Sequence, residues 1–117
     1  MDKALRRRQL AIAQGVYFAA TGVWPLIDMR SFERVTGPKA DKWLVRTVGV
    51  LVAVIGGTLI AAGRREVSSE LSGLAAGSPA GLAWIDVRYA SKRRISPIYL
   101  ADAAVEAAFV SAWAAVA

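Results

Sequence analysis

The sequence predicts an all-α fold, an integral membrane four-helix bundle, and three observations support that prediction. The seventeen residues between Arg46 and Arg64 contain no charge. A second charge-free run of nineteen residues extends from Gln9 to Ile27. Hydrophobic residues make up 56% of the 117 residues, whereas soluble globular domains contain about 45–50%. With their flanks, runs of this length form helices of about 30 Å, the thickness of a bilayer's hydrocarbon core.

The first predicted span covers residues 9–27. A small side chain recurs every four residues at Ala11, Gly15 and Ala19, which places these residues on one face. Trp24 and Pro25 close the helix, with the indole at the depth of the membrane interface. A basic leader precedes the span and contains Lys3, Arg6, Arg7 and Arg8.

The polar connection over residues 28–42 leads to the second predicted span, residues 43–63. Ser31 is expected to cap one short helical turn over residues 32–35, and Gly37-Pro38 to break it. Asp41 is the expected N-cap of the span. The span carries small residues every four positions, which we expect to pack against another helix; they are Gly49, Ala53, Gly57 and Ala61.

The third predicted span covers residues 71–89, after a helix start at Ser68 or Ser69 with Glu70. Pro79 should kink it, because proline has no N–H to donate to the Ala75 carbonyl. Another small-residue face is formed by Gly73, Gly77 and Gly81.

The fourth predicted span covers residues 97–116. Ser96 is expected to be its N-cap and Pro97 its first residue. Asp102 and Glu106 lie one turn apart on the same face. The alternative to four membrane spans is a soluble, compact α-bundle whose core helices are very apolar.

Four spans would place both termini on one side of the bilayer and gather the polar residues of the spans in the opposite half. Glu106 is the deepest of these, about 13 Å along its helix from Pro97. Carboxylates at such depth are costly and are usually paired, protonated or facing water. The candidate residues for a ligand or proton site are Trp24, Trp43, Arg46, Asp86, Tyr89, Asp102 and Glu106.

Two interpretations of these polar residues remain open. In the first, they form ion pairs and hydrogen bonds that fix the helix register. Arg46 would form ion pairs with Asp102 and Glu106, and Arg88 or Tyr89 would be the partner of Asp86. In the second, they form an acidic pocket beneath aromatic side chains that binds or transports a small cationic or amphipathic ligand, or a proton.

Composition excludes several kinds of chemistry. The chain has no cysteine and no histidine, which removes disulfides, thiol catalysis, the commonest general base and the commonest metal ligand. No nucleophile–base pair or phosphate-binding loop is visible, so we expect neither an enzyme nor a cofactor nor a metal. The net charge of +6 comes from basic residues at the ends of apolar runs. We therefore expect a lipid bilayer as the partner, with a homo-oligomer or a larger membrane partner as further options, and no nucleic acid.

The first half of the chain resembles small four-span bacterial proteins of the DoxX-like kind. The resemblance covers residues 15–57 and rests on Trp24-Pro25, Phe32, Gly37, Trp43, Arg46 and Gly49. It implies a four-helix bundle in the bacterial inner membrane and little chemistry. The chain also resembles the small multidrug transporters in length, span count and an embedded Glu. Their acid lies in the first span, so their function is not carried over.

Overall fold

The computed structural model describes residues 2–117, which form five helices and, within that range, no strand. The helices are α1 (Lys3–Ile27), α2 (Met29–Thr36), α3 (Lys42–Gly63), α4 (Ser69–Ser91) and α5 (Ile98–Ala115). The long helices agree with the predicted spans to within a few residues, except that α1 also includes most of the basic leader. The short turn expected over residues 32–35 is a complete helix, α2, capped by the Asp28 side chain.

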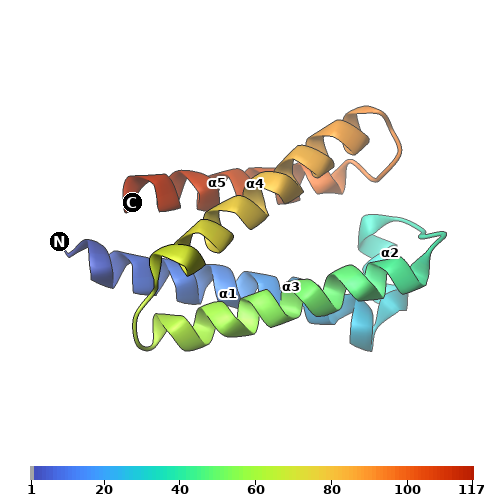
Figure 1. The fold of residues 1–117 in the computed structure, drawn as a ribbon. Helices are drawn as coiled ribbons and strands as arrows, with labels where there is room; N and C mark the ends of the chain where they lie inside the picture. Colours follow the sequence, from blue (N-terminus) through green and yellow to red (C-terminus); the bar gives the residue numbers. More distant parts are fainter. Residues whose placement is uncertain (1) are drawn as a thin grey trace.

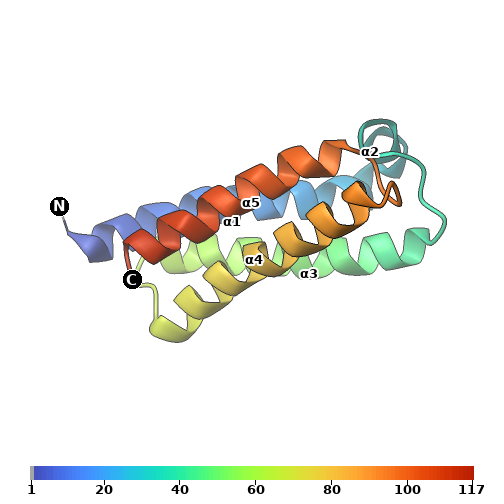
Figure 2. The same ribbon diagram turned by 90° about the horizontal axis from the view of Figure 1, so that it is seen from above.

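The long helices form two pairs, α1 with α3 and α4 with α5 (Figure 1). Both chain termini and the α3–α4 turn lie at one end, and α2 and the α4–α5 turn lie at the other (Figures 1 and 2). The pairs meet mainly near the terminal end, where a buried apolar cluster contains Ala11, Leu59, Ala75, Trp113 and Val116. The molecule measures 44 Å along its long axis, close to the thickness of a bilayer with its headgroups.

Glycines let the α1 and α3 backbones touch. A Cβ atom at Gly56 would lie 2.5 Å from the Ala19 backbone nitrogen, and one at Gly22 would lie 2.6 Å from the Gly49 carbonyl oxygen. The contacting glycines are seven residues apart on each helix; they are Gly15 and Gly22 on α1, and Gly49, Gly56 and Gly63 on α3. A seven-residue repeat keeps one seam facing its partner when two helices cross at a small angle.

This finding corrects part of the predicted small-residue faces, which were based on a four-residue spacing. Among the described residues, no atom from beyond the glycine's own helical surroundings lies within 4 Å of a Cβ atom built at Gly57, Gly73, Gly77 or Gly81. Because a helix has 3.6 residues per turn, a four-residue repeat drifts around the helix and a seven-residue repeat remains nearly on one face. Gly49 belongs to both repeats, and it is the member of the predicted α3 face whose Cβ would clash with α1.

Within the described range of residues 2–117, three helices are long and apolar enough to span a membrane: α1, α3 and α5. Large apolar side chains on their outer surfaces are exposed, among them Val54 at 61% and Leu51 at 59%, as expected for helices that face lipid. Helix α4 is 23 residues long but carries serines, glycines and the charged residues Glu70, Asp86 and Arg88. Helix α4 is therefore less apolar than the other three long helices and is not among the candidate membrane spans.

A buried polar link joins α1 to the second pair. The Gln14 side chain, fully buried, donates from Nε2 to the Ala75 carbonyl oxygen at 2.9 Å. Its Oε1 accepts a hydrogen bond from Trp113 Nε1 at 2.6 Å. The Ala75 carbonyl is the group that Pro79 leaves without its helical donor, as the sequence predicted. Gln14 therefore repairs the break in α4 and connects α1, α4 and α5.

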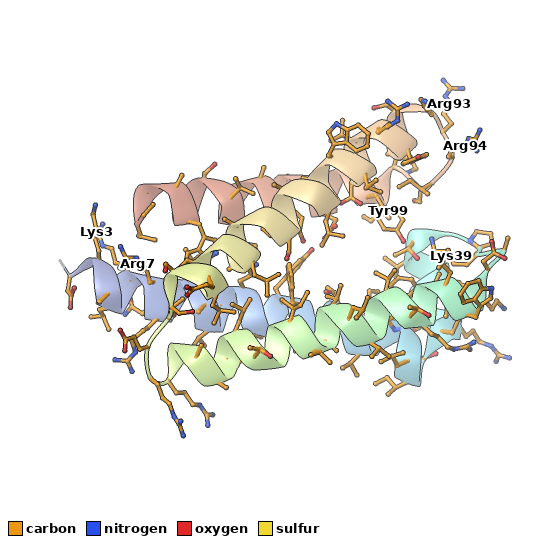
Figure 3. All side chains as sticks on the ribbon, viewed as in Figure 1. Lys3, Arg7, Lys39, Arg93, Arg94 and Tyr99 are labelled. Carbon is orange, nitrogen blue, oxygen red and sulfur yellow. The ribbon has the colours of Figure 1, made fainter. Side chains whose placement is uncertain are left out.

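Arginines of the leader bind the C-terminal ends of other helices. Arg8 Nε donates to the Gly63 carbonyl oxygen at 3.0 Å, and its guanidinium also donates to Arg64 O. Arg7 Nε donates to Val116 O at 2.8 Å, and Figure 3 shows Arg7 at the terminal end of the bundle. A cationic side chain at a helix C-terminus donates hydrogen bonds to the free carbonyl groups and interacts favourably with the negative end of the helix dipole. The leader thus binds the C-terminal ends of α3 and α5, a role that its positive charge alone did not indicate.

Two predicted helix starts agree with the structure in part. Asp41 is the N-cap residue of α3, as predicted, but it makes no side-chain cap hydrogen bond. Helix α5 begins at Ile98 with Pro97 as its N-cap residue, one residue later than predicted, although Ser96 Oγ still accepts the Ile98 N–H at 3.3 Å. Ser68 caps α4 by accepting the Leu71 N–H, in agreement with the sequence.

Candidate functional site

A cavity of about 340 Å³ lies between the two helix pairs, toward the end that carries α2. The pairs diverge at this end (Figure 1), and all five helices contribute to its lining. Most of the lining is apolar or aromatic. The lining residues that carry its chemistry are Tyr17, Thr21, Trp24, Phe32, Asp86, Tyr99, Asp102 and Glu106.

Three carboxyl groups face the cavity from the α4–α5 pair: Asp86, Asp102 and Glu106. Asp86 is 6% exposed and Glu106 is 2% exposed. Asp86 Oδ2 and Glu106 Oε2 are buried and have no hydrogen-bond partner among the described residues. Asp102 accepts a hydrogen bond from the Tyr17 hydroxyl group of α1. The sequence-predicted convergence of Asp86, Asp102 and Glu106 is therefore present in the fold.

None of the basic side chains that the structure describes in residues 2–117 lines this cavity. Within residues 2–117, the one ion pair between a basic and an acidic side chain joins Lys42 and Glu33 at 3.2 Å, outside the cavity. Burial of an ionised carboxylate without a counter-charge is strongly unfavourable. The arrangement therefore needs a proton or a ligand cation to neutralise it.

Aromatic rings surround the α2 side of the cavity. Trp24 and Phe32 pack edge to face, with ring centroids 5.3 Å apart. The ammonium group of Lys39 lies 4.9 Å from the ring centroid of Tyr99 and 5.8 Å from that of Phe32. Figure 3 shows Lys39 and Tyr99 extending toward each other from the α2–α3 connection and α5. The ammonium also donates to the Thr36 carbonyl oxygen at 2.9 Å. These aromatic rings therefore already hold one alkylammonium ion.

Local hydrogen bonds position α2 over the cavity. Trp24 Nε1 donates to Ser31 Oγ at 2.7 Å, which fixes the indole against α2. The Lys39 backbone N–H donates to Glu33 Oε2 at 3.0 Å. This bond, together with Lys42 and Lys39, lowers the pKa of the Glu33 carboxyl from its ordinary value. Glu33 thus remains ionised at neutral pH and anchors the α2–α3 connection.

The predicted ion pairs of the register interpretation are not formed. Arg46 is exposed and lines a separate open hollow, together with Arg30, Arg34 and Lys42. The Arg88 guanidinium lies over the Trp84 ring at 5.2 Å and does not pair with Asp86. Both cations lie on the outward side of their helices, a direction that residue spacing alone did not specify. Trp43, 68% exposed, and Tyr89 are also absent from the cavity lining.

Several cavity residues were missing from the predicted site. Among them are Tyr17 and Thr21 of α1. Lys39 does not line the cavity, but its ammonium group lies against two of the lining rings, Phe32 and Tyr99. A signal was present in the sequence, because Gln14, Tyr17, Thr21 and Trp24 follow one another at spacings of three and four. That spacing places them on one helix face. A polar stripe in an otherwise apolar span indicates a side that faces protein.

Within residues 2–117, no group of three or more acidic side chains is placed to hold a metal ion. No known family model, no curated protein and no solved structure matches this chain.

Proposed function

We propose that this chain is a four-span integral membrane protein that binds a small amphipathic organic cation in the cavity between its helix pairs. The observation that carries the proposal is the acidic, aromatic cavity, in which two carboxyl groups have buried oxygens without partners. An organic cation would neutralise the carboxylates through charge and contact the rings through cation–π attraction. The apolar remainder of the lining suits a hydrophobic body attached to that charge.

Four spans are proposed although three helices meet the composition criterion. Helix α4 packs beside α5 and, like the other long helices, extends from one end of the bundle to the other (Figure 2). Asp86 is turned toward the cavity and is buried, and Glu70 lies in the first turn at the end of α4. Polar residues in these positions are compatible with a span, because one avoids lipid and the other reaches the headgroups.

The test is a binding titration with benzyltrimethylammonium, which joins an aromatic ring to a permanent cation, using the detergent-purified chain. Neopentylbenzene, its uncharged isostere, is the ligand control. Glu106→Gln should weaken binding of the cation about tenfold or more, because it removes the charge opposite the ligand. Glu70→Gln removes the same charge outside the cavity and should leave the affinity unchanged. Affinity should also rise between pH 5 and 9, since protons and the cation compete for the same oxygens.

Equal affinity for the cation and its neutral isostere would contradict the proposal. So would equal affinity of the Glu106→Gln and wild-type chains. Binding of protons alone, seen as pH-dependent stability that Glu106→Gln abolishes without any cation binding, would instead assign the cavity to proton transfer.

A second candidate function is that of an interaction subunit in a larger membrane assembly. The observation in its favour is the exposed small-residue face of α4, where Cβ atoms built at Gly73, Gly77 and Gly81 would meet no other part of residues 2–117 within 4 Å. Such a face allows close approach of a helix from a membrane partner. Purification in mild detergent with mass analysis distinguishes the two candidates, because a subunit should be retained with its partner and lose it on Gly77→Leu substitution.

A further inference from the structure

A second, basic site lies outside the cavity, where α2 meets the start of α3. It is an open hollow of about 440 Å³, lined by Met29, Arg30, Glu33, Arg34, Pro38, Lys42 and Arg46. It shares no lining residue with the acidic cavity. We call it the basic hollow, and the inference below does not depend on what the cavity binds.

The basic hollow concentrates like charges that the protein neutralises only in part. Arg30 and Arg34 are one turn apart on α2, as are Lys42 and Arg46 on α3, and like charges at this spacing destabilise a helix. The one carboxylate, Glu33, is already shared between Lys42 Nζ at 3.2 Å and the Lys39 backbone N–H at 3.0 Å. The three guanidinium groups form no ion pair among residues 2–117, although Arg30 and Arg34 are also attracted at longer range by the Asp28 carboxylate. An anion bound here would relieve their repulsion.

The first turn of α3 adds positive potential at the same place. Its N-cap residue, Asp41, makes no side-chain hydrogen bond to the helix, so the first N–H groups of this 22-residue helix lack the usual side-chain acceptor. The positive end of the helix dipole favours an anion in this position. Lys42 and Arg46, which line the basic hollow, belong to these first two turns.

The position of the basic hollow in the membrane identifies the anion. Helix α3 is one of the candidate spans, and the basic hollow lies at its first residues. Trp43, next to Lys42, is 68% exposed, as is usual for an indole at the headgroup level. The anion available at that level is the phosphate of a phospholipid, whose oxygens match the two-pronged donor geometry of arginine. We propose that the basic hollow binds the phosphate group of an anionic phospholipid headgroup.

The test is native mass spectrometry of the delipidated, detergent-purified chain titrated with phosphatidylglycerol, or with phosphatidylcholine of the same acyl chains. Wild type should bind phosphatidylglycerol about tenfold or more tightly, and Arg34→Gln/Arg46→Gln should remove that preference. The matched control is Arg93→Gln/Arg94→Gln, which removes two charges from the exposed α4–α5 turn, where both side chains point away from the bundle (Figure 3). The control should retain the preference.

The proposal would be overturned by equal affinity of wild type for both lipids, by an equal loss of affinity in the control, or by displacement of phosphatidylglycerol by glycerol 3-phosphate at a comparable concentration. The last result would assign the basic hollow to a free phosphate compound. If Arg34→Gln/Arg46→Gln loses helical content, Arg34→Lys/Arg46→Lys replaces it. This variant keeps the charge and should still bind more weakly, because lysine cannot make the two-pronged contact; unchanged affinity would contradict the assignment.

Discussion

The α1–α3 pair and the α4–α5 pair both contain regularly spaced glycines, but only the first pair uses them for contact. Between α1 and α3 the backbones touch at Gly22, Gly49 and Gly56. In α4 the glycines at 73, 77 and 81 face open space. The comparison shows that small residues at a four-residue spacing are not enough for helix contact. In this protein the glycines that contact another helix are those that repeat every seven residues. The first pair is therefore close-packed, and the second is joined to it by a few specific bonds.

The largest effect expected from this comparison follows from enlarging a glycine in each pair. Gly56→Leu should lower the free energy of unfolding by about 3 kcal/mol or more, because its Cβ would lie 2.5 Å from the Ala19 backbone. Gly77→Leu should change it by less than about 1 kcal/mol, since no other part of the described chain lies within 4 Å of a Cβ atom built at Gly77. Thermal melting of both variants in detergent, followed by circular dichroism, makes the measurement. Equal losses would mean that α4 also packs through its glycines.

The second prediction concerns the polar link between the pairs. Gln14→Leu should cost about 2–4 kcal/mol, because it leaves the Ala75 carbonyl and the Trp113 indole N–H buried without partners. Pro79→Ala supplies a helical N–H to the Ala75 carbonyl, so Gln14→Leu should cost about 1 kcal/mol less in that background. The four variants form a double-mutant cycle in thermal melting. Additive costs would show that Gln14 does not compensate for the proline.

The third prediction compares two adjacent arginines that bind different pairs. Arg8→Gln should destabilise by about 1 kcal/mol, because two hydrogen bonds to the C-terminal end of α3 are lost. Arg7→Gln loses one bond to the end of α5 and should cost about half as much. Arg6, which is exposed, is the matched control, and Arg6→Gln should leave the melting temperature unchanged. If all three variants behave alike, the leader acts only through its total charge.

The smallest effect is expected between Arg46 and Glu106. These residues line separate hollows, so Arg46→Gln and Glu106→Gln should be additive in thermal melting within about 0.5 kcal/mol. Glu106→Gln alone should be neutral or stabilising, since it removes a buried charge that has no partner. A coupling energy above about 1 kcal/mol would instead support the ion pair between Arg46 and Glu106 in the register interpretation.

The sequence by itself determined the helical fold, the positions of the long helices and the carboxyl groups that meet in the cavity. Charge-free runs of near-spanning length specify helices, because only a helix or a closed barrel satisfies the backbone in lipid. The spacing of Asp102 and Glu106 places both on one face, and the reversed direction of α4 brings Asp86 to the same depth. The carbonyl freed by Pro79 also follows from local chemistry alone.

Only the tertiary structure decided which faces meet. Arg46 and Trp43 lie at the end of the bundle that contains the cavity, as the sequence predicted. The rotation of α3 about its axis, however, directs Arg46 to the basic hollow and Trp43 to the surface. Helix rotation in turn depends on which glycines let the α1 and α3 backbones touch. Gln14, Tyr17 and Lys39 acquire their roles from partners 61, 85 and 60 residues away, Ala75, Asp102 and Tyr99. Hydrophobic periodicity fixes the face of each helix only approximately, whereas close packing between helices fixes its rotation.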